Sequence, residues 1–320
     1  MTASHLAEAL LHLARRGASA VTSRARVASP GFNATLNRLL SAPPGRAGSL
    51  LADPVFESAK AWAPGPKTLG ALSGDLLEPD LVAALASATD YQMARDMTPW
   101  WHQHRAWEAS LREEKSVLVT SGTGSGKTEC FLIPILNDIL RHRRSGGGVQ
   151  AILLYPLNAL IESQRERLSA WAAGLDGRVR FALYNGDTPQ TAFKAGGRKS
   201  SKVELTNRAD IRANPPDILV TNITMLEYLL LREGDRSILQ ASQGALRWMV
   251  LDEAHGYVGS QAAEMALLLR RVRKAFGVSA TDMRLMATSA TIGGGADATE
   301  KLAAFAAALA GQDLARIEVV

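Results

Sequence analysis

The chain has 320 residues, 47% of them hydrophobic and 21% charged, which is enough apolar material for a packed core and excludes disorder of the whole chain. Its net charge of +5 is a mild bias towards polyanions that does not distinguish nucleic acid from anionic lipid. Cys130 is the sole cysteine of the sequence, which excludes an internal disulfide. No apolar run approaches the roughly 20 residues of a membrane-spanning helix. We therefore expect a soluble, cytoplasmic protein with no membrane partner.

The first 95 residues are rich in Ala, Leu, Arg, Pro and Gly, and two stretches, at 5–16 and 78–88, have helical spacing. Between Arg15 and Arg46 the sequence contains six arginines and no acidic residue. Such a segment fits a contact with nucleic acid, an organelle transit peptide, or solvated helices that pack on the main domain. The composition leaves these alternatives open. We expect a mainly helical accessory region over residues 1–95.

From residue 96 onwards, short apolar runs alternate with helical segments. The strand-like runs lie at 116–120, 151–156, 179–185, 217–222, 248–253, 284–290 and 317–320, and the helical segments at 129–142, 159–173, 224–233 and 261–277. Apolar strands that alternate with helices are typical of a parallel sheet covered on both faces. We therefore predict an α/β domain over residues 96–320, with binding residues in the loops at the carboxyl ends of its strands.

The stretch VTSGTGSGKT, at 119–128, joins the first of these strands to the first helix. Its glycines allow backbone N–H groups to converge on phosphate oxygens, and the helix N-terminus adds a favourable dipole. In this P-loop arrangement Lys127 reaches the β- and γ-phosphates, and the Thr128 hydroxyl binds Mg²⁺. Ser121 stands where the strict pattern has glycine. The predicted nucleotide-binding residues here are Ser121, Gly122, Thr123, Gly124, Ser125, Gly126, Lys127, Thr128 and Glu129.

A second apolar strand ends in adjacent carboxylates, Asp252 and Glu253, within WMVLDEAH at 248–255. Two neighbouring carboxylates at a strand end are costly without a cation. We therefore predict that Asp252 holds Mg²⁺ through water and that Glu253 orients and deprotonates an attacking water. Together with Lys127 they form the predicted catalytic set of an ATP hydrolase that uses ATP and Mg²⁺.

Three motifs, SGTGSGKT, DEAH and the SAT triplet at 289–291, resemble those of the first RecA-like domain of superfamily 2 helicases. The resemblance implies a RecA-like P-loop NTPase fold and an ATP-dependent DNA helicase or translocase motor. It implies that Gln103, in PWWHQHRAW, contacts adenine. It also implies that His255, Ser289 and Thr291 couple hydrolysis to movement. YNGDTP and TNITMLEYLLLR are similar to stretches of the MrfA-like DNA helicases and of the large helicases of bacterial anti-phage systems of the Druantia type.

By the same resemblance, three loops face the backbone of nucleic acid, at 155–160, 185–189 and 220–222. The candidate contacts in these loops are Pro156, Asn158, Gly186, Asp187, Thr221 and Asn222, and Arg165, a few residues beyond the first loop, is a further candidate. A motor of this class grips phosphates, so its binding is expected to be salt-sensitive and largely independent of sequence. Leu157 departs from the family pattern, which usually has threonine there.

Superfamily 2 motors close ATP between two RecA-like domains, and the second domain supplies an arginine finger. Only about 30 residues follow the SAT triplet, too few for such a domain. We therefore expect the second domain elsewhere in a longer protein or on another subunit, and poor hydrolysis by this chain alone, since a finger contributes about 10³–10⁵ in rate. DNA and other defence-system proteins are further expected partners. A nucleotide-dependent DNA-binding scaffold or switch, and an RNA helicase, are the alternatives.

Overall fold

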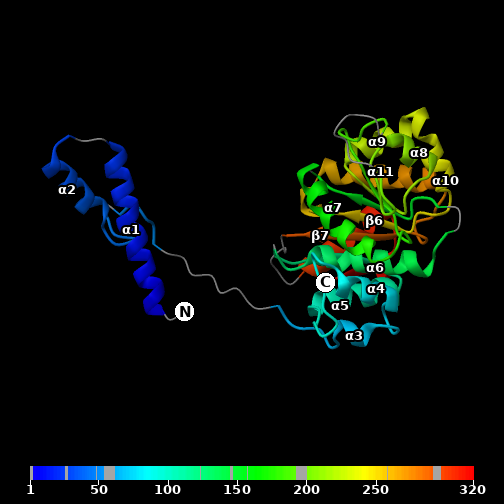
Figure 1. Cartoon of the computed structure of the whole chain (residues 1–320), viewed down its shortest axis with the longest axis horizontal. Coiled ribbons are helices and arrows are strands. Elements are labelled where there is room, and N and C mark those ends of the chain that lie inside the picture. Colours follow the sequence, from blue (N-terminus) through cyan, green and yellow to red (C-terminus); the bar gives the residue numbers. More distant parts are fainter. Residues whose placement is uncertain are drawn as a thin grey trace. The chain divides into compact units, whose positions relative to one another are not determined.

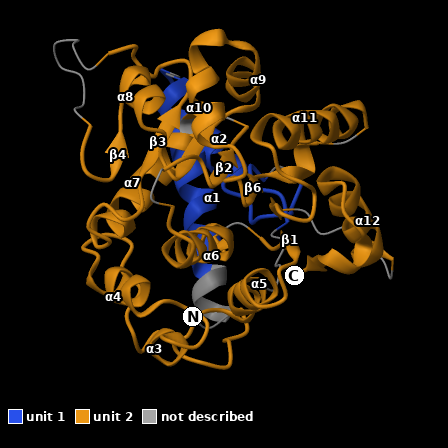
Figure 2. Ribbon diagram, turned by 90° about the vertical axis from the view of Figure 1, so that its right-hand side faces the viewer, with its two compact units in different colours: residues 1–61 blue, residues 62–320 orange. Residues whose placement is uncertain are grey.

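The chain forms two compact units, residues 1–61 and 62–320 (Figures 1 and 2). A computed structural model describes residues 3–25, 28–47, 49–53, 62–122, 124–144, 147–156, 158–191, 200–257, 259–290 and 297–320. Within these residues, no helix combines the length and the apolar character needed to cross a bilayer.

The smaller unit contains two helices, α1 (Ala3–Ala25) and α2 (Pro30–Leu40), and α1 includes the helical stretch predicted at 5–16. Ser29 caps α2, because its side chain accepts a hydrogen bond from the Phe32 backbone N–H at 3.4 Å and Pro30 follows at the first helical position. The small side chains of Ala14 and Ala18 are buried, and the amide of Asn37 donates to Thr22 at 3.3 Å. These contacts hold α2 against α1.

The larger unit is built on an eight-stranded sheet in which every pairing is parallel, with strand order β4-β3-β5-β2-β6-β7-β1-β8. The strands are β1 (Ser116–Thr120), β2 (Ala151–Leu154), β3 (Phe181–Tyr184), β4 (Glu204–Leu205), β5 (Ile218–Thr221), β6 (Trp248–Leu251), β7 (Arg284–Ser289) and β8 (Ile317–Val319). The predicted parallel α/β sheet is therefore confirmed, and each predicted strand-like run contains one strand. The two-residue strand β4 has no recognisable periodicity in the sequence and was not predicted.

Helices cover both faces of this sheet (Figure 1). The helices of the larger unit are α3 (Leu69–Leu72), α4 (Pro79–Ser87), α5 (Trp101–Leu111), α6 (Lys127–Arg141), α7 (Asn158–Ala173), α8 (Arg208–Ala213), α9 (Ile223–Leu231), α10 (Arg236–Ala241), α11 (Ser260–Phe276) and α12 (Ala298–Ala310). Successive residues of the central strands enter different cores, as Ile152 and Leu153 do on β2. This alternation explains the continuous apolar runs, since side chains on both faces are removed from water. The four predicted helices, α6, α7, α9 and α11, are confirmed within two residues at each end.

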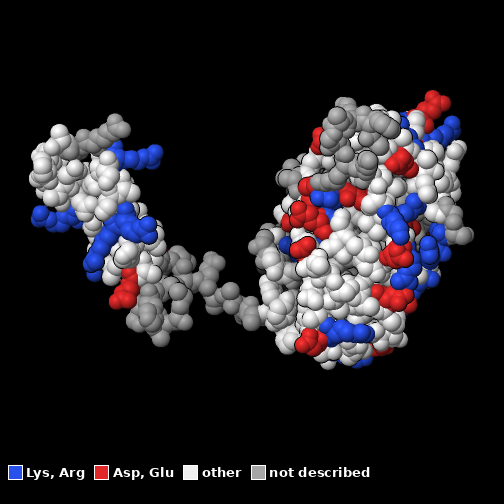
Figure 3. Space-filling view, viewed as in Figure 1, with Lys and Arg blue, Asp and Glu red and all other residues white. Residues whose placement is uncertain are grey.

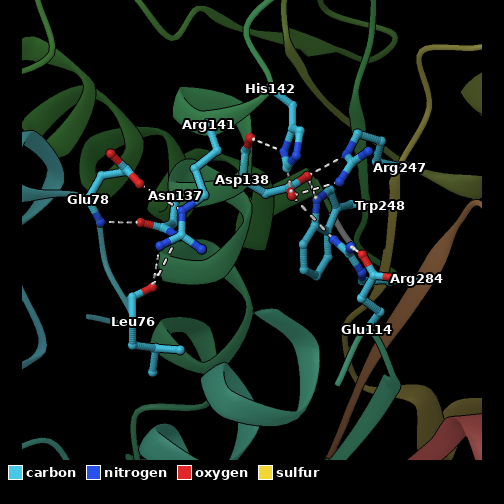
Figure 4. Close-up of polar contacts among 10 residues, drawn as sticks. All are labelled: Leu76, Glu78, Glu114, Asn137, Asp138, Arg141, His142, Arg247, Trp248 and Arg284. Atoms are coloured by element: carbon cyan, nitrogen blue, oxygen red, sulfur yellow. Dashed lines mark hydrogen bonds and ion pairs between the residues drawn. The ribbon is translucent and has the colours of Figure 1, made fainter. Parts of the chain in front are cut away.

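Residues 62–95, which the sequence analysis grouped with the N-terminal region, pack into the larger unit. Leu81 and Leu85 of α4 are buried in the same core as the α6 and α7 side chains. Asn137 of α6 fastens the preceding loop, because its side chain accepts from the Glu78 N–H at 2.6 Å and donates to the Leu76 carbonyl at 3.4 Å (Figure 4). The boundary between the units therefore lies at 61/62.

A buried carboxylate, Asp138, ties the end of α6 to the amino ends of two strands (Figure 4). It accepts two hydrogen bonds from Arg247, at 2.6 and 2.9 Å, and one from the Trp248 indole at 2.7 Å. Arg284 lies 3.4 Å from the same carboxylate and stacks over the Trp248 ring at 4.8 Å. Burial alone would raise the pKa of Asp138, but the charges and hydrogen bonds of Arg247 and Arg284 outweigh it and hold the pKa below its ordinary value.

We expect Asp138→Asn to lower the free energy of unfolding by about 3 kcal/mol, because it removes the buried carboxylate from Arg247 and leaves Arg284 with the exposed Glu114, at 3.1 Å, as its remaining ion-pair partner among the described residues. Chemical denaturation followed by circular dichroism measures the change. Since the folded pKa lies below the ordinary value, the contribution of Asp138 is complete near neutral pH and is lost only as the pH falls below about 4.

Glu264→Gln is the matched control, because Glu264 is an exposed acidic residue on α11 and its substitution should change stability by no more than about 0.5 kcal/mol. Equal effects of the two substitutions would contradict a stabilising role for Asp138.

Candidate nucleotide-binding site

The glycine-rich turn at 121–126 links β1 to α6. Gly124 and Gly126 have φ angles of +76° and +80°, in the left-handed region that favours glycine. Ser125 and Ser121 are buried in the turn, and their hydroxyls hydrogen bond to each other. The backbone therefore curls before α6 begins at Lys127, so that the N-terminal N–H groups of the helix face the turn. Thr123 lies outside the described residues.

Gln103, at the start of α5, fastens this turn from the side. Its side-chain oxygen accepts from the Trp100 N–H at 2.9 Å, and its amide donates to the Gly126 carbonyl at 3.2 Å. His102, beside it, lies 2.9 Å from the Ser125 carbonyl. A Cβ at Gly126 would come within 2.3 Å of the Gln103 amide nitrogen, so the close approach of α5 requires glycine. The structure therefore brings Gln103 next to the predicted phosphate cradle.

The Lys127 side chain folds back over the turn and donates to the Ser121 carbonyl at 3.1 Å. Ser289, at the end of β7, is the register partner of Thr120, and its carbonyl accepts from the Ser121 N–H at 3.2 Å. The predicted coupling residue Ser289 therefore abuts the start of the turn. Its predicted companion Thr291 lies outside the described residues.

Asp252 and Glu253 follow β6, beside β7. Thr288 of β7 connects them, because its hydroxyl donates to the Asp252 carboxylate and accepts from the Glu253 N–H at 3.2 Å. Glu253 has a φ of +55°, a left-handed conformation that is strained for a non-glycine residue and typical of functional turns. His255 Nδ1 lies 3.1 Å from the Glu253 carboxylate. The DEAH turn is thus held to the end of β7.

The glycine-rich turn follows β1 and the acidic pair follows β6. Because β6, β7 and β1 are consecutive in the strand order and parallel, the two halves of the predicted site lie at the same, carboxyl end of the strands. Burial raises the pKa of Asp252, and Thr288 and the positive charge of Lys127 oppose this rise. The ammonium group of Lys127 therefore acts electrostatically on the Asp252 carboxylate. Thr128 and Glu129 lie on the first turn of α6 directly after Lys127, whereas Gly122 lies on the turn before it.

The loops predicted to face nucleic acid come together at the ends of β2, β5 and β3. The Asn222 amide donates to the Asn158 side chain at 2.9 Å, and Asn222 also caps α9 by accepting from the Met225 N–H. A hollow of about 710 Å³ lies beside them, lined by Asn158, Glu162, Leu183, Asn185, Gly186, Asp187, Thr188, Pro189, Gln190, Glu204, Leu205, Thr206 and Arg208. Pro156 is exposed at the end of β2, and Leu157 lies outside the described residues.

Two of the predicted nucleic-acid contacts, Arg165 and Thr221, are bound to protein groups outside the predicted set. Arg165 pairs with Glu162 at 2.7 Å and with Glu204 at 3.4 Å. The Thr221 hydroxyl is buried and donates to the Tyr184 carbonyl, so it holds β5 to β3. For either residue to contact the backbone of nucleic acid, these ion pairs or this hydrogen bond would have to rearrange.

Two residues that shape the site, Thr288 and Arg208, were not predicted from the sequence. Thr288 lies inside a strand-like run, where a hydroxyl residue carries no signal of its own, and it is found only through the register of β7 with β6. Arg208, one of the few arginines that are almost fully buried, donates to the Thr188 and Asn185 carbonyls, each at 3.0 Å. It fixes the turn at 185–189 and shows no motif in the sequence.

A glycine-rich turn after β1, an acidic pair after β6 and a parallel sheet are the features of a P-loop nucleotide-binding domain. The sequence profile of the DEAD/DEAH box helicases matches residues 100–298. Because this match covers more than half of the sequence, the chain belongs to the DEAD/DEAH box helicase family.

Several known proteins resemble the chain. Druantia protein DruE of Escherichia coli (strain UMEA 4076-1) is 30% identical over 291 residues, which covers 61% of this chain and 16% of DruE. The ATP-dependent helicase YprA of Bacillus subtilis (strain 168) is 28% identical over 203 residues, which covers 63% of this chain and 24% of YprA. The crystal structure of the helicase MrfA bound to DNA and AMPPNP superposes with a TM-score of 0.57 at 22% identity, and covers 82% of this chain and 30% of MrfA. The chain thus spans a quarter or less of its curated relatives' length.

We expect Gly126→Ala to lower stability by about 1–2 kcal/mol, the cost of a left-handed conformation for a residue with a Cβ, and to displace the Gln103 amide from the turn. Thermal unfolding measures the first effect and binding of a fluorescent ATP analogue the second.

Gly186→Ala is the control, because no atom lies within 4 Å of a Cβ built there and Gly186 is not among the glycines with positive φ. If Gly126→Ala behaved like this control in both measurements, the turn would not need its left-handed residue.

Proposed function

We propose that this chain is the ATP-binding motor domain of an ATP-dependent DNA helicase or translocase, working with a second RecA-like domain in anti-phage defence or DNA repair. The observation that carries the proposal is that Lys127 follows β1 and the Asp252–Glu253 pair follows β6, two parallel strands separated in the sheet by β7 alone. A lysine at a P-loop and a carboxylate pair across from it is the arrangement that P-loop NTPases use to bind and cleave a triphosphate.

In the proposed mechanism, the N–H groups of the turn and the Lys127 ammonium bind the phosphate oxygens, and Gln103 contributes to adenine recognition. Ser121, Gly122, Thr123, Gly124, Ser125, Gly126 and Glu129 complete the proposed cradle. Glu253 accepts a proton from the attacking water, and its position depends on the Thr288 hydroxyl, which holds the DEAH turn. His255, Ser289 and Thr291 are proposed to link this site to the loops beyond β2 and β5.

The donor chemistry of the site fits Mg²⁺, which prefers hydroxyl and carboxylate oxygens and retains several waters. Thr128 and Asp252 would hold the ion, and when bound it would neutralise charge on the phosphates. Among the described residues no group of three or more acidic, histidine or cysteine side chains forms an all-protein metal cage. This agrees with an ion held largely by the nucleotide.

DNA is the proposed track, supported by MrfA having been solved with DNA. Pro156, Asn158, Arg165, Gly186, Asp187, Thr221 and Asn222 are the proposed contacts. The Asn222–Asn158 hydrogen bond supports a shared backbone-binding edge formed by the ends of β2 and β5, because amide groups suit phosphate and sugar oxygens.

We expect Lys127→Ala to weaken nucleotide binding about 10–100-fold, since charged hydrogen bonds contribute about 1.5–3 kcal/mol. Isothermal titration with a non-hydrolysable ATP analogue measures this. Lys301→Ala, which removes an exposed lysine from α12, should leave binding unchanged.

Glu253→Gln should retain nucleotide binding and reduce ATP turnover of the intact protein by at least about 100-fold, the contribution of a general base. Glu264→Gln is the matched control. Survival of the protein's activity after Glu253→Gln would instead favour a nucleotide-dependent switch, and stimulation by RNA but not DNA would favour an RNA helicase.

A further inference from the structure

The positive charge of the chain is concentrated in its smaller unit. Residues 1–61 contain seven basic and three acidic residues, a net charge of +4, whereas residues 62–320 contain 29 basic and 28 acidic residues, a net charge of +1. The smaller unit therefore carries most of the net charge of +5 in about a fifth of the length. Any general attraction of this chain for a polyanion comes mainly from residues 1–61.

Among the residues that the structure describes near the proposed nucleic-acid loops, the larger unit has little free positive charge. Arg165 is paired with two carboxylates, and the Arg208 guanidinium donates to backbone carbonyls inside the turn. Three acidic residues, Glu162, Asp187 and Glu204, line the neighbouring hollow. Phosphates that approach this edge would therefore meet hydrogen-bond donors with little net positive charge.

The arginines of the smaller unit are in the opposite situation. All five that the structure describes are exposed, and none of them has an ion-pair partner within the described residues: Arg15, Arg16, Arg24, Arg38 and Arg46. Figure 3 shows basic side chains projecting from this unit with little acidic surface beside them on the face in view. Uncommitted guanidinium groups are well suited to phosphate oxygens, which they bind in a bidentate manner.

We propose that the α1–α2 unit binds the phosphate backbone of nucleic acid and supplies most of the salt-dependent affinity of this chain. This inference rests on the proposed function. It assigns most of the binding to nucleic-acid phosphates to the smaller unit and ATP binding and hydrolysis to the larger one. Because the two units belong to one chain, phosphate contacts made by the first raise the effective concentration of nucleic acid for the second. The alternative ligand for this unit is another protein, because apolar side chains such as Phe32 and Leu39 are also exposed on it.

The test uses the whole chain with three substitutions on α1, Arg15→Gln, Arg16→Gln and Arg24→Gln, which keep helix propensity while removing three charges. Affinity for a fluorescent single-stranded oligonucleotide is measured by anisotropy from 50 to 200 mM salt. Three lost phosphate contacts should reduce the slope of log K against log[salt] by about 2, so the variant should lose about 20-fold less affinity than wild type over this range.

The matched control removes the same charge from the larger unit through Arg236→Gln, Arg270→Gln and Lys301→Gln, all of them exposed residues. It should retain a slope close to that of wild type. A second variant, with Arg15→Lys, Arg16→Lys and Arg24→Lys, should also retain the slope, because its charge is unchanged. Circular dichroism establishes that each variant is folded.

An unchanged slope in the α1 variant would overturn the proposal, and so would an equal loss in the control, which would indicate a general charge effect. Nucleic-acid binding that is unaffected, together with loss of a protein partner by the α1 variant, would assign the unit to protein docking. Failure of the wild-type chain to bind any nucleic acid would instead contradict the proposed function.

Discussion

The parallel pairing of β7 with both β1 and β6 is the constraint on which the candidate site depends. β1 ends in the glycine-rich turn, β6 ends in the DEAH turn, and β7 lies between them with Thr288 and Ser289 at its end. The Thr288 side chain holds the Asp252–Glu253 turn, and the carbonyl of the next residue, Ser289, accepts a hydrogen bond from the Ser121 N–H. A slip of one residue in β7 would reverse the faces of its side chains and separate these contacts.

The opposite end of the sheet makes that arrangement rigid. Asp138 binds Arg247 and Arg284, which lie at the amino ends of β6 and β7, so one helix holds both strands in register. The same helix, α6, begins at Lys127. A single element therefore carries the proposed phosphate-binding lysine near one end and the buried carboxylate Asp138 near the other, and this connects the stability of the fold to the geometry of the candidate site.

Much of the fold could be predicted because its signals are local. Each strand of three or more residues coincides with an apolar run, since a strand buried on both faces must be apolar throughout. The left-handed turn at Gly126 follows from the spacing of the glycines. Pro134 is a local signal that would misplace a helix end. Proline normally interrupts a helix, yet α6 continues through Pro134, whose ring is buried. The unit boundary at 61/62 was not predictable, because the side-chain contacts of Asn137 with residues 76–78 have no signature in the sequence.

The sequence by itself determined which residues we propose for the chemistry, namely the glycines, Lys127 and Thr128, and the Asp252–Glu253 pair, since their types and order match what phosphate and metal binding require. It also determined the segregation of charge into residues 1–61. Only the tertiary structure decided which hydroxyl holds the acidic pair, that Arg165 is bound to two carboxylates, and that Gln103 reaches Gly126. These contacts join residues on separate elements, and their partners are set by strand order and helix packing.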